Sequence, residues 1–140
     1  AQVENSGHSL RDILTIASMI ERETTGEDRT DIASVIYNRL NNSTGGTMGY
    51  LQIDATLVYI NGGKEPSEAD KFIDSPYNTY LYQGLPAGPI ANPGLESIVA
   101  ALNPAQSKNY YYALGDDNIH HFFRTYDQHQ AFIASQERYK

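Results

Sequence analysis

An apolar stripe near the start of the chain most constrains how this sequence can fold. Between Ser9 and Arg22, apolar residues recur at spacings of three and four: Leu10, Ile13, Leu14, Ile16, Ala17 and Ile20. This period is typical of a helix with one buried face. Ser9 can cap the helix, and Asp12 lies in its first turn, where a carboxylate is favourable. The sequence therefore predicts a helix over 9–22 that must pack against a core.

Further along, the pattern predicts more helices and one hairpin. Two runs of β-favouring residues, 109–114 and 119–124, flank the turn cluster G-D-D-N. We expect Asp54 to cap a short helix. The remaining predicted helical segments are Thr30–Leu40, Ala55–Tyr59, the turn Ser67–Asp70, Leu95–Asn103 and Tyr126–Tyr139. Since 140 residues fit one domain, we expect residues 1–140 to form a single domain of the α+β class, dominated by helices, with a small C-terminal β-hairpin.

The segment 75–94 is broken by four prolines and three glycines, too many for a long helix or strand. An irregular stretch of roughly 20 residues is uncommon in a compact domain and is usually functional or disordered. Apolar and aromatic residues are interleaved through it: Tyr77, Tyr80, Leu85 and Ile90. They argue for an ordered, functional segment.

Composition excludes several classes of function. A net charge of -7 without a visible basic cluster would repel a phosphate backbone and argues against nucleic acid as a partner. With no cysteine, disulfides, thiolate metal sites and cysteine nucleophiles are excluded. His120 and His121 are neighbours in a predicted strand and must point to opposite faces, so they are poor ligands for one ion. We expect no metal and no cofactor, and without G-x-S-x-G the carboxylates remain as reactive groups.

Two carboxylates, Glu21 and Glu23, stand at the end of the first helix. On a helical wheel they lie on opposite flanks of the apolar stripe, so periodicity does not choose between them. Both could be solvated side chains paired with Arg22 and Arg29. A carboxyl at a helix C-terminus opposes the helix dipole, however, and with partial burial this would raise its pKa and keep a proton available for donation.

Several separated motifs resemble the lysozyme-like lytic transglycosylases. I-E-R-E-T, with Glu23 and Thr24, resembles the Glu-Ser that ends the first long helix of that superfamily. Y-L-Q-I-D-A-T, from Tyr50, resembles its Gly-Leu-Met-Gln stretch, with Gln52 in the glutamine position, and P-Y-N-T-Y is similar to its Ala-Tyr-Asn-Ala-Gly motif. The resemblance implies a lysozyme-like fold.

A narrower resemblance covers nearly the whole chain and is to the YceG-like family of endolytic murein transglycosylases. Six segments in the family's order carry it: I-E-R-E-T, N-R-L of Asn38 to Leu40, L-Q-I-D-A-T, Y-N-T-Y, G-L-P-A-G-P-I-A-N-P-G, and H-x-F of His120 followed by Thr125 and His129. Ala55 and Ala87 stand where the family commonly has proline. Both are scaffold positions, so the chemistry is little affected.

This resemblance implies that Glu23 is the general acid and base, and that Glu21 is a supporting or surface residue. In this mechanism the substrate's N-acetyl group and 6-hydroxyl stabilise and capture the reacting sugar, giving a 1,6-anhydro end without water. A second carboxylate, as in ordinary glycosidases, is not required. Asp54 is the one candidate for that role. The residues expected to bind substrate or line its cleft are Gln52, Asp54, Tyr77, Asn78, Thr79, Tyr80, Asn92 and His120.

The resemblance also implies peptidoglycan glycan strands as substrate and cell-wall synthases as candidate partners. The family's membrane-spanning segment and the domain after it lie outside this sequence. We therefore expect the whole protein to be membrane-anchored, with this domain on the extracytoplasmic face of the bacterial cell membrane. Two alternatives stay open: a hydrolytic muramidase of the lysozyme type, and a catalytically silent module that binds glycan or divisome proteins.

Overall fold

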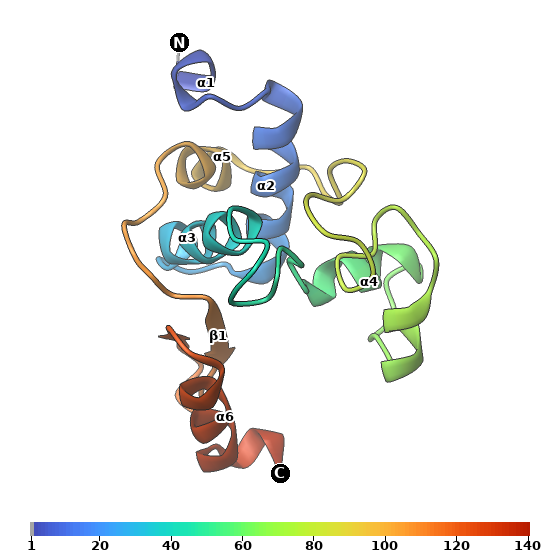
Figure 1. The fold of residues 1–140 in the computed structure, drawn as a ribbon, viewed down its shortest axis with the longest axis vertical. Helices are drawn as coiled ribbons and strands as arrows, with labels where there is room; N and C mark the ends of the chain where they lie inside the picture. Colours follow the sequence, from blue (N-terminus) through green and yellow to red (C-terminus); the bar gives the residue numbers. More distant parts are fainter. Residues whose placement is uncertain (1) are drawn as a thin grey trace.

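The computed structural model describes residues 2–140 and shows a helical body with a small antiparallel sheet (Figure 1). The elements in chain order are α1 (Gln2–Ser6), α2 (Leu10–Glu23), α3 (Arg29–Leu40), α4 (Asp54–Ile60), a 3₁₀ helix (Glu68–Phe72), α5 (Leu95–Leu102), β1 (Tyr111–Leu114), β2 (His120–Phe123), α6 (Tyr126–Ser135) and a 3₁₀ helix (Glu137–Tyr139). The α+β class, dominated by helices with a hairpin near the C-terminus, is confirmed. Only α1 was not predicted.

Helix α2 lies at the centre of the helical body, where α5, α3 and α4 pack around it (Figure 1). Its apolar stripe is fully buried, with Ile13, Ile16 and Ile20 at 0% exposure. Ser9 caps the helix as predicted, since its hydroxyl accepts a hydrogen bond from the backbone N–H of Asp12. Burial of this stripe positions the C-terminal end of α2, and therefore Glu23, inside the molecule.

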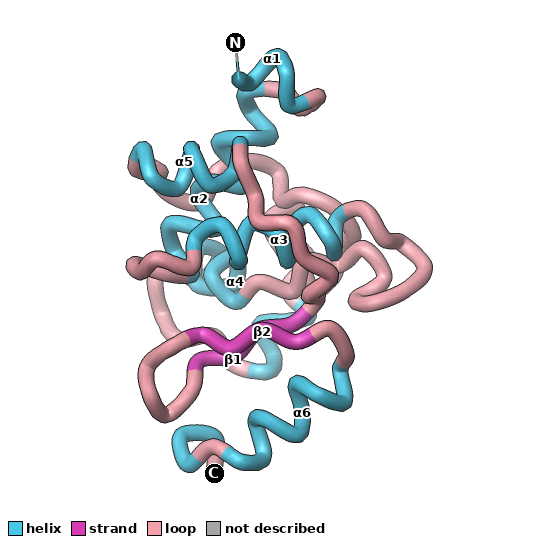
Figure 2. Tube along the Cα trace, turned by 90° about the vertical axis from the view of Figure 1, so that its left-hand side faces the viewer, coloured by secondary structure: helices cyan, strands magenta, loops and turns pink. Residues whose placement is uncertain are grey.

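The hairpin lies between the helical body and α6 (Figure 2). Its strands pair Tyr112 with Phe122 and Leu114 with His120. Because side chains alternate across a strand, this face packs against the body, and Tyr112 and Phe122 contact the core. The other face meets α6, as in the ring contact between Phe123 and Phe132.

The irregular segment 75–94 is ordered, as predicted, by hydrogen bonds to the helices. The backbone N–H of Ile90 donates to the hydroxyl of Ser18 on α2 at 3.0 Å, and Ile90 is buried. Near its middle, the guanidinium of Arg11 donates to the carbonyl of Ala87 at 2.6 Å. The segment thus forms a wall alongside α2 instead of a free loop.

Two details of the sequence prediction are wrong. Asp54 does not cap α4: Ile53 takes the N-cap position, and Asp54 is the first helical residue, with its side chain bonded to Tyr80. The last helix does not continue to Tyr139 but ends at Ser135. Beyond Gln136, the backbone N–H groups of Glu137 and Arg138 donate hydrogen bonds to the carboxylate of Asp116 in the hairpin turn. This tertiary contact stabilises a separate 3₁₀ turn at the end of the chain.

Within residues 2–140, none of the helices has both the length and the apolar character that crossing a membrane requires.

Candidate active site

Three hollows in the surface share one residue, Glu23, the last residue of α2. The first lies against α4 and the turn after it, the second against the α2–α3 loop and the hairpin tip, and the third between α3, the hairpin and α6. Each of the two larger hollows has a volume of about 600 Å³. An extended ligand running from one hollow to the next would therefore pass Glu23.

The Glu23 carboxyl is half-buried and accepts a hydrogen bond from the hydroxyl of Tyr112 on β1. Burial raises the pKa of Glu23 above its usual value; the Tyr112 hydrogen bond partly offsets this. The negative charge of Asp54 raises the pKa further, while His120 and Arg39 lower it by smaller amounts. Because the net shift is upward, this carboxyl retains its proton at higher pH than an ordinary glutamate and is suited to proton donation.

Asp54 and Tyr80 face the same hollow as Glu23. The Tyr80 hydroxyl donates a hydrogen bond to Asp54 Oδ1. Burial first, and then the Asp54 carboxylate, raise the pKa of Tyr80 well above its usual value, so the phenol stays protonated. The contact fixes a second carboxylate beside Glu23 and occupies one of its oxygens.

Gln52 projects into this hollow from a strained backbone. Its φ is 51°, in the left-handed region that non-glycine residues rarely adopt. On either side, Leu51 and Ile53 are buried, and the Gln52 backbone N–H donates to the Thr79 carbonyl at 3.1 Å. These anchors hold the strained conformation and turn the exposed Gln52 side chain outward, an arrangement found at functional sites.

Asn78 and Thr79 are each 1% exposed and do not reach the cleft. The Asn78 amide donates to the carbonyls of Lys71 and Ile73 at 3.0 and 2.8 Å. The Thr79 hydroxyl accepts the backbone N–H of Ile53 at 3.0 Å. Both residues lie beneath the segment that carries Gln52 and Asp54, and their hydrogen bonds stabilise the backbone around it.

Tyr77 and Asn92 lie outside the immediate surroundings of Glu23. Tyr77 is half-buried and its ring contacts that of Tyr59 with centroids 4.9 Å apart. Tyr59 lines the first hollow. Asn92 is exposed on the segment leading into α5. Among residues 2–140, neither Tyr77 nor Asn92 lines a hollow that contains Glu23.

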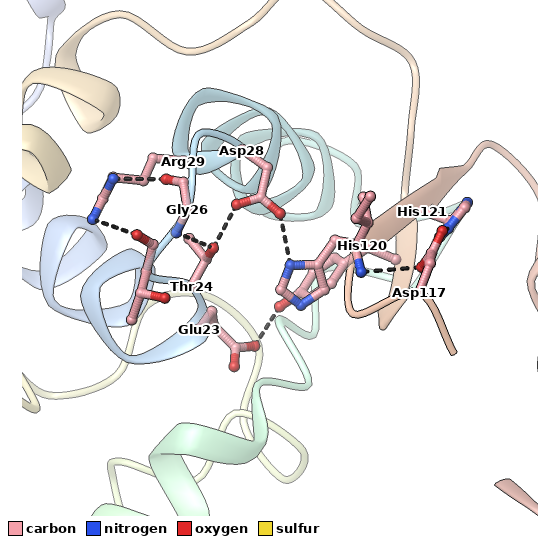
Figure 3. Close-up of polar contacts among 11 residues, drawn as sticks. Glu23, Thr24, Gly26, Asp28, Arg29, Asp117, His120 and His121 are labelled. Carbon is pink, nitrogen blue, oxygen red and sulfur yellow. Dashed lines mark hydrogen bonds and ion pairs between the residues drawn. The ribbon is translucent and has the colours of Figure 1, made fainter. Parts of the chain in front are cut away.

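His120 does line the cleft, in two of the three hollows. Its Nδ1 lies 2.6 Å from the carboxylate of Asp28 in the α2–α3 loop (Figure 3). His121 points to the opposite face, as strand geometry predicts, and bonds to Asp117 (Figure 3). Of these two adjacent histidines, His120 therefore belongs to the site and His121 does not.

Sequence reasoning did not single out Tyr112 or Arg39 as site residues. Arg39 is 7% exposed, and its guanidinium donates to the carbonyls of Tyr110 and Leu51 at 2.6 and 2.5 Å. It also lies over the Tyr112 ring, 5.8 Å from the centroid. Two signals could have found them: Arg39 belongs to the N-R-L motif, and pairing the predicted strands across G-D-D-N places Tyr112 on the same face as His120.

Glu21 has a structural contact away from Glu23. Its Oε1 accepts the backbone N–H of Gly94 at 2.8 Å and the Ser97 hydroxyl at 2.9 Å. The Gly94 hydrogen bond, followed by that of Ser97, lowers the pKa of Glu21. Gly94 is the N-cap of α5, so Glu21 supplies the acceptor that this helix start lacks.

As for metal ions, the part of the chain from residue 2 onward contains no group of three or more histidine, aspartate and glutamate side chains that could hold one.

A half-buried carboxylic acid in an open cleft, on an α+β scaffold dominated by helices, defines a candidate acid–base enzyme. The chain belongs to the YceG-like family, whose family model matches residues 1–135.

Curated relatives agree with this placement. A protein named endolytic murein transglycosylase from Bacillus subtilis is 39% identical over 132 residues, covering 92% of this chain and 35% of the relative. A protein of the same name from Streptococcus pneumoniae is 37% identical, covering 79% of this chain and 20% of the relative. This chain thus spans about a third or less of the length of these relatives.

A solved structure gives the same result for the fold. The crystal structure of a YceG-like protein from Listeria monocytogenes superimposes with a TM-score of 0.82 at 38% sequence identity. The match covers 93% of this chain and 41% of that one. Most of this fold is therefore shared with a longer YceG-like protein.

Proposed function

We propose that this domain cleaves peptidoglycan as an endolytic lytic transglycosylase. The bond would be the β-1,4 link between N-acetylmuramic acid and N-acetylglucosamine within a glycan strand, and the product a 1,6-anhydro-muramyl end. The observation that carries the proposal is the raised pKa of Glu23 at the point shared by three hollows. Support comes from relatives named endolytic murein transglycosylase.

Glu23 would act first as an acid and then as a base. Its carboxyl donates a proton to the glycosidic oxygen as the bond between that oxygen and C1 of the muramyl residue breaks. The substrate's N-acetyl group stabilises the oxocarbenium-like C1. The Glu23 carboxylate then accepts the proton of the 6-hydroxyl as that oxygen bonds to C1. The proton returns to Glu23, and no water is consumed.

The surrounding residues divide between binding and support. Gln52, Tyr80 and His120 line the cleft and are placed to contact saccharide hydroxyl and amide groups. The Asp54 carboxylate, held by Tyr80, raises the pKa of Glu23 and favours the proton-donating form. Asn78 and Thr79 would hold the Gln52 segment in its strained conformation.

The proposal extends to where the reaction takes place. Peptidoglycan strands lie outside the cytoplasmic membrane, so we propose that the domain works on the extracytoplasmic face, with the whole protein anchored in the membrane. Cell-wall synthases would be its partners there, because new glycan strands are the substrate they supply.

Product analysis tests the reaction. Glycan strands incubated with the protein and examined by mass spectrometry should yield fragments ending in anhydro-muramyl residues, each lighter by one water than the hydrolysed equivalent. Ordinary reducing ends would instead indicate a muramidase, with Asp54 as the second carboxylate that hydrolysis requires. Binding without cleavage would indicate a silent glycan-binding module and would overturn the proposal.

Glu23→Gln tests the assigned acid. Glutamine keeps the size of the side chain and can still accept the Tyr112 hydrogen bond, but its amide cannot transfer a proton to the glycosidic oxygen. We expect cleavage to fall by about 10²–10⁴-fold while glycan binding is retained. Glu21→Gln is the matched control, since its hydrogen bonds to α5 need only an acceptor and most activity should remain. An active Glu23→Gln protein would show that the assignment of Glu23 is wrong.

A further inference from the structure

Thr24, the residue after the proposed acid, starts a chain of side-chain contacts around Glu23. The Thr24 hydroxyl donates to Asp28 Oδ1 at 2.5 Å, and it accepts the backbone N–H of Gly26 at 3.1 Å (Figure 3). The Thr24 backbone N–H also donates to the Ile20 carbonyl and ends α2. The backbone on the C-terminal side of Glu23 is therefore tied to Asp28.

Asp28 uses both carboxylate oxygens. Oδ1 accepts from Thr24, and Oδ2 lies 2.6 Å from Nδ1 of His120 (Figure 3). The side chains of His120 and Asp28 are only 15% and 21% exposed, so solvent screens this pair less than a surface ion pair. A carboxylate at Nδ1 also keeps a proton on that nitrogen and fixes the plane of the ring.

His120 contacts Tyr112, which links this chain of contacts back to Glu23. The two rings meet edge to face, with centroids 5.6 Å apart and an interplanar angle of 89°. The Tyr112 hydroxyl in turn donates to Glu23 Oε1. Contacts therefore run from Glu23 through Thr24, Asp28, His120 and Tyr112 back to the Glu23 carboxyl, and they join the end of α2, the α2–α3 loop and both strands.

We propose that Asp28 is a positioning residue for the reaction: by holding Nδ1 of His120, it fixes His120 against Tyr112 and so orients the Glu23 carboxyl in the cleft. This inference rests on the proposed function, since it assigns Asp28 a role in the same site. It goes beyond the assignment of Glu23 because Asp28 need not touch the substrate.

Replacing Asp28 by asparagine tests this role without a large change in shape. An amide has only one acceptor oxygen and carries no negative charge, so the charge-assisted hydrogen bond to the Nδ1–H of His120 is lost or becomes a weaker neutral one. We expect kcat on soluble glycan strands to fall about 10–100-fold, the range that a misplaced catalytic group produces, while KM changes less than about twofold. A purely structural role would change the amount of folded protein, not kcat per folded molecule.

A double-mutant cycle adds a second criterion. If Asp28 acts through His120, the double variant Asp28→Asn with His120→Gln should lose no more kcat than the more impaired single variant. Multiplicative losses would show that Asp28 acts independently of His120 and would overturn the proposal.

The hairpin supplies a matched control. His121 and Asp117 form the same kind of pair, with an Nε2–Oδ2 distance of 3.0 Å, on the face turned away from Glu23. Asp117→Asn should therefore leave kcat unchanged. If it lowers kcat as much as Asp28→Asn does, the loss reflects the hairpin as a whole, and the assignment to Asp28 fails.

A spectroscopic measurement separates this inference from the proposed function. At a pH where the ring is neutral, imidazole ¹⁵N shifts should place the His120 proton on Nδ1 in the wild-type protein, and Asp28→Asn should weaken that preference measurably, because the acceptor loses its charge. The His120→Gln spectrum assigns the signal. An unchanged tautomer would overturn the role of Asp28 even in a protein that cleaves no glycan. A protein in which Asp28→Asn changes the tautomer as expected, but in which the wild type cleaves no glycan, would overturn the proposed function while leaving the Asp28–His120 contact in place.

Discussion

Glu21 and Glu23 stand two residues apart on one helix, yet their carboxyl groups meet opposite environments. Glu21 accepts hydrogen bonds from Gly94 and Ser97, which lower its pKa. Burial beside Asp54 raises the pKa of Glu23. At the residue scale, the chemical difference between two identical side chains therefore comes from their surroundings: hydrogen-bond donors at a helix start for Glu21, and burial, with a second carboxylate nearby, for Glu23.

Asp54→Asn should move the alkaline limb of the pH–activity profile to lower pH. The Asp54 charge raises the pKa of Glu23, so its removal lowers that pKa, and the proton-donating form of Glu23 disappears at lower pH. The profile of kcat/KM measures this in the free enzyme. Asp74→Asn, which removes the charge of a carboxylate in a similar contact with Tyr82 on the surface, should leave the limb in place. A shift toward higher pH would contradict the assigned coupling.

At the scale of elements, the glycine-rich loop between α3 and the Gln52 segment supports the hairpin. Gly46 has a φ of 57°, and a Cβ there would lie 2.5 Å from the ring of Tyr110, just before β1. Tyr110 has little freedom to move, because its hydroxyl accepts a hydrogen bond from Asn42 and its carbonyl accepts one from Arg39. The loop thus packs closely against the entry to the hairpin.

Gly46→Ala should therefore destabilise the fold more than Gly62→Ala. Both glycines have a positive φ, so each alanine costs about 1–2 kcal/mol for its backbone conformation. Nothing lies within 4 Å of a Cβ at Gly62, whereas at Gly46 the overpacking against Tyr110 adds about 1–3 kcal/mol. Urea unfolding measures both free energies. Equal losses would show that Tyr110 moves aside freely.

At the scale of the whole molecule, two polar side chains of α3, the buried Arg39 and the half-buried Asn38, join the helical body to the sheet. Arg39 reaches the carbonyls of Leu51 and Tyr110, one in the segment that carries Gln52 and the other before β1. Asn38 donates to the carbonyls of Ser107 and Asn109 at 3.0 and 2.9 Å. The cleft therefore exists only when the body and the hairpin are folded together, since its walls come from both.

Arg39→Met should lower the free energy of unfolding by about 3 kcal/mol or more. Hydrogen bonds from a charged donor are worth about 1.5–3 kcal/mol each, and two carbonyls lose their partner. Thermal and urea unfolding, followed by circular dichroism and by tyrosine fluorescence, should still give one transition at a lower midpoint. Arg138→Met, which removes a partly buried contact from an exposed side chain to the Gly115 carbonyl, is the control and should cost less than Arg39→Met. A small effect at Arg39 would mean that the body and the hairpin are coupled by apolar contacts alone.

Local sequence patterns were enough to predict both strands and every α-helix except α1, in the order in which they occur. The stripe from Ile13 to Ile20 and the two β-favouring runs around G-D-D-N carry local periods of 3.6 and 2, which depend only on neighbouring residues. The α+β class, the buried first helix and the hairpin followed from these periods. The opposite directions of His120 and His121 followed as well, because a strand alternates its side chains.

The contacts of the polar side chains, in contrast, depend on how distant segments meet in the folded molecule. The helical wheel did not distinguish Glu21 from Glu23. The surroundings of their carboxyl groups differ because of Gly94, Asp54 and Tyr112, all more than 30 residues away along the chain. The local sequence predicted Asp54 to be a helix cap, but its carboxylate instead accepts a hydrogen bond from the hydroxyl of Tyr80, 26 residues later. Hydrogen bonds and burial act through space, so a site assembled from distant segments has no local sequence pattern that specifies it.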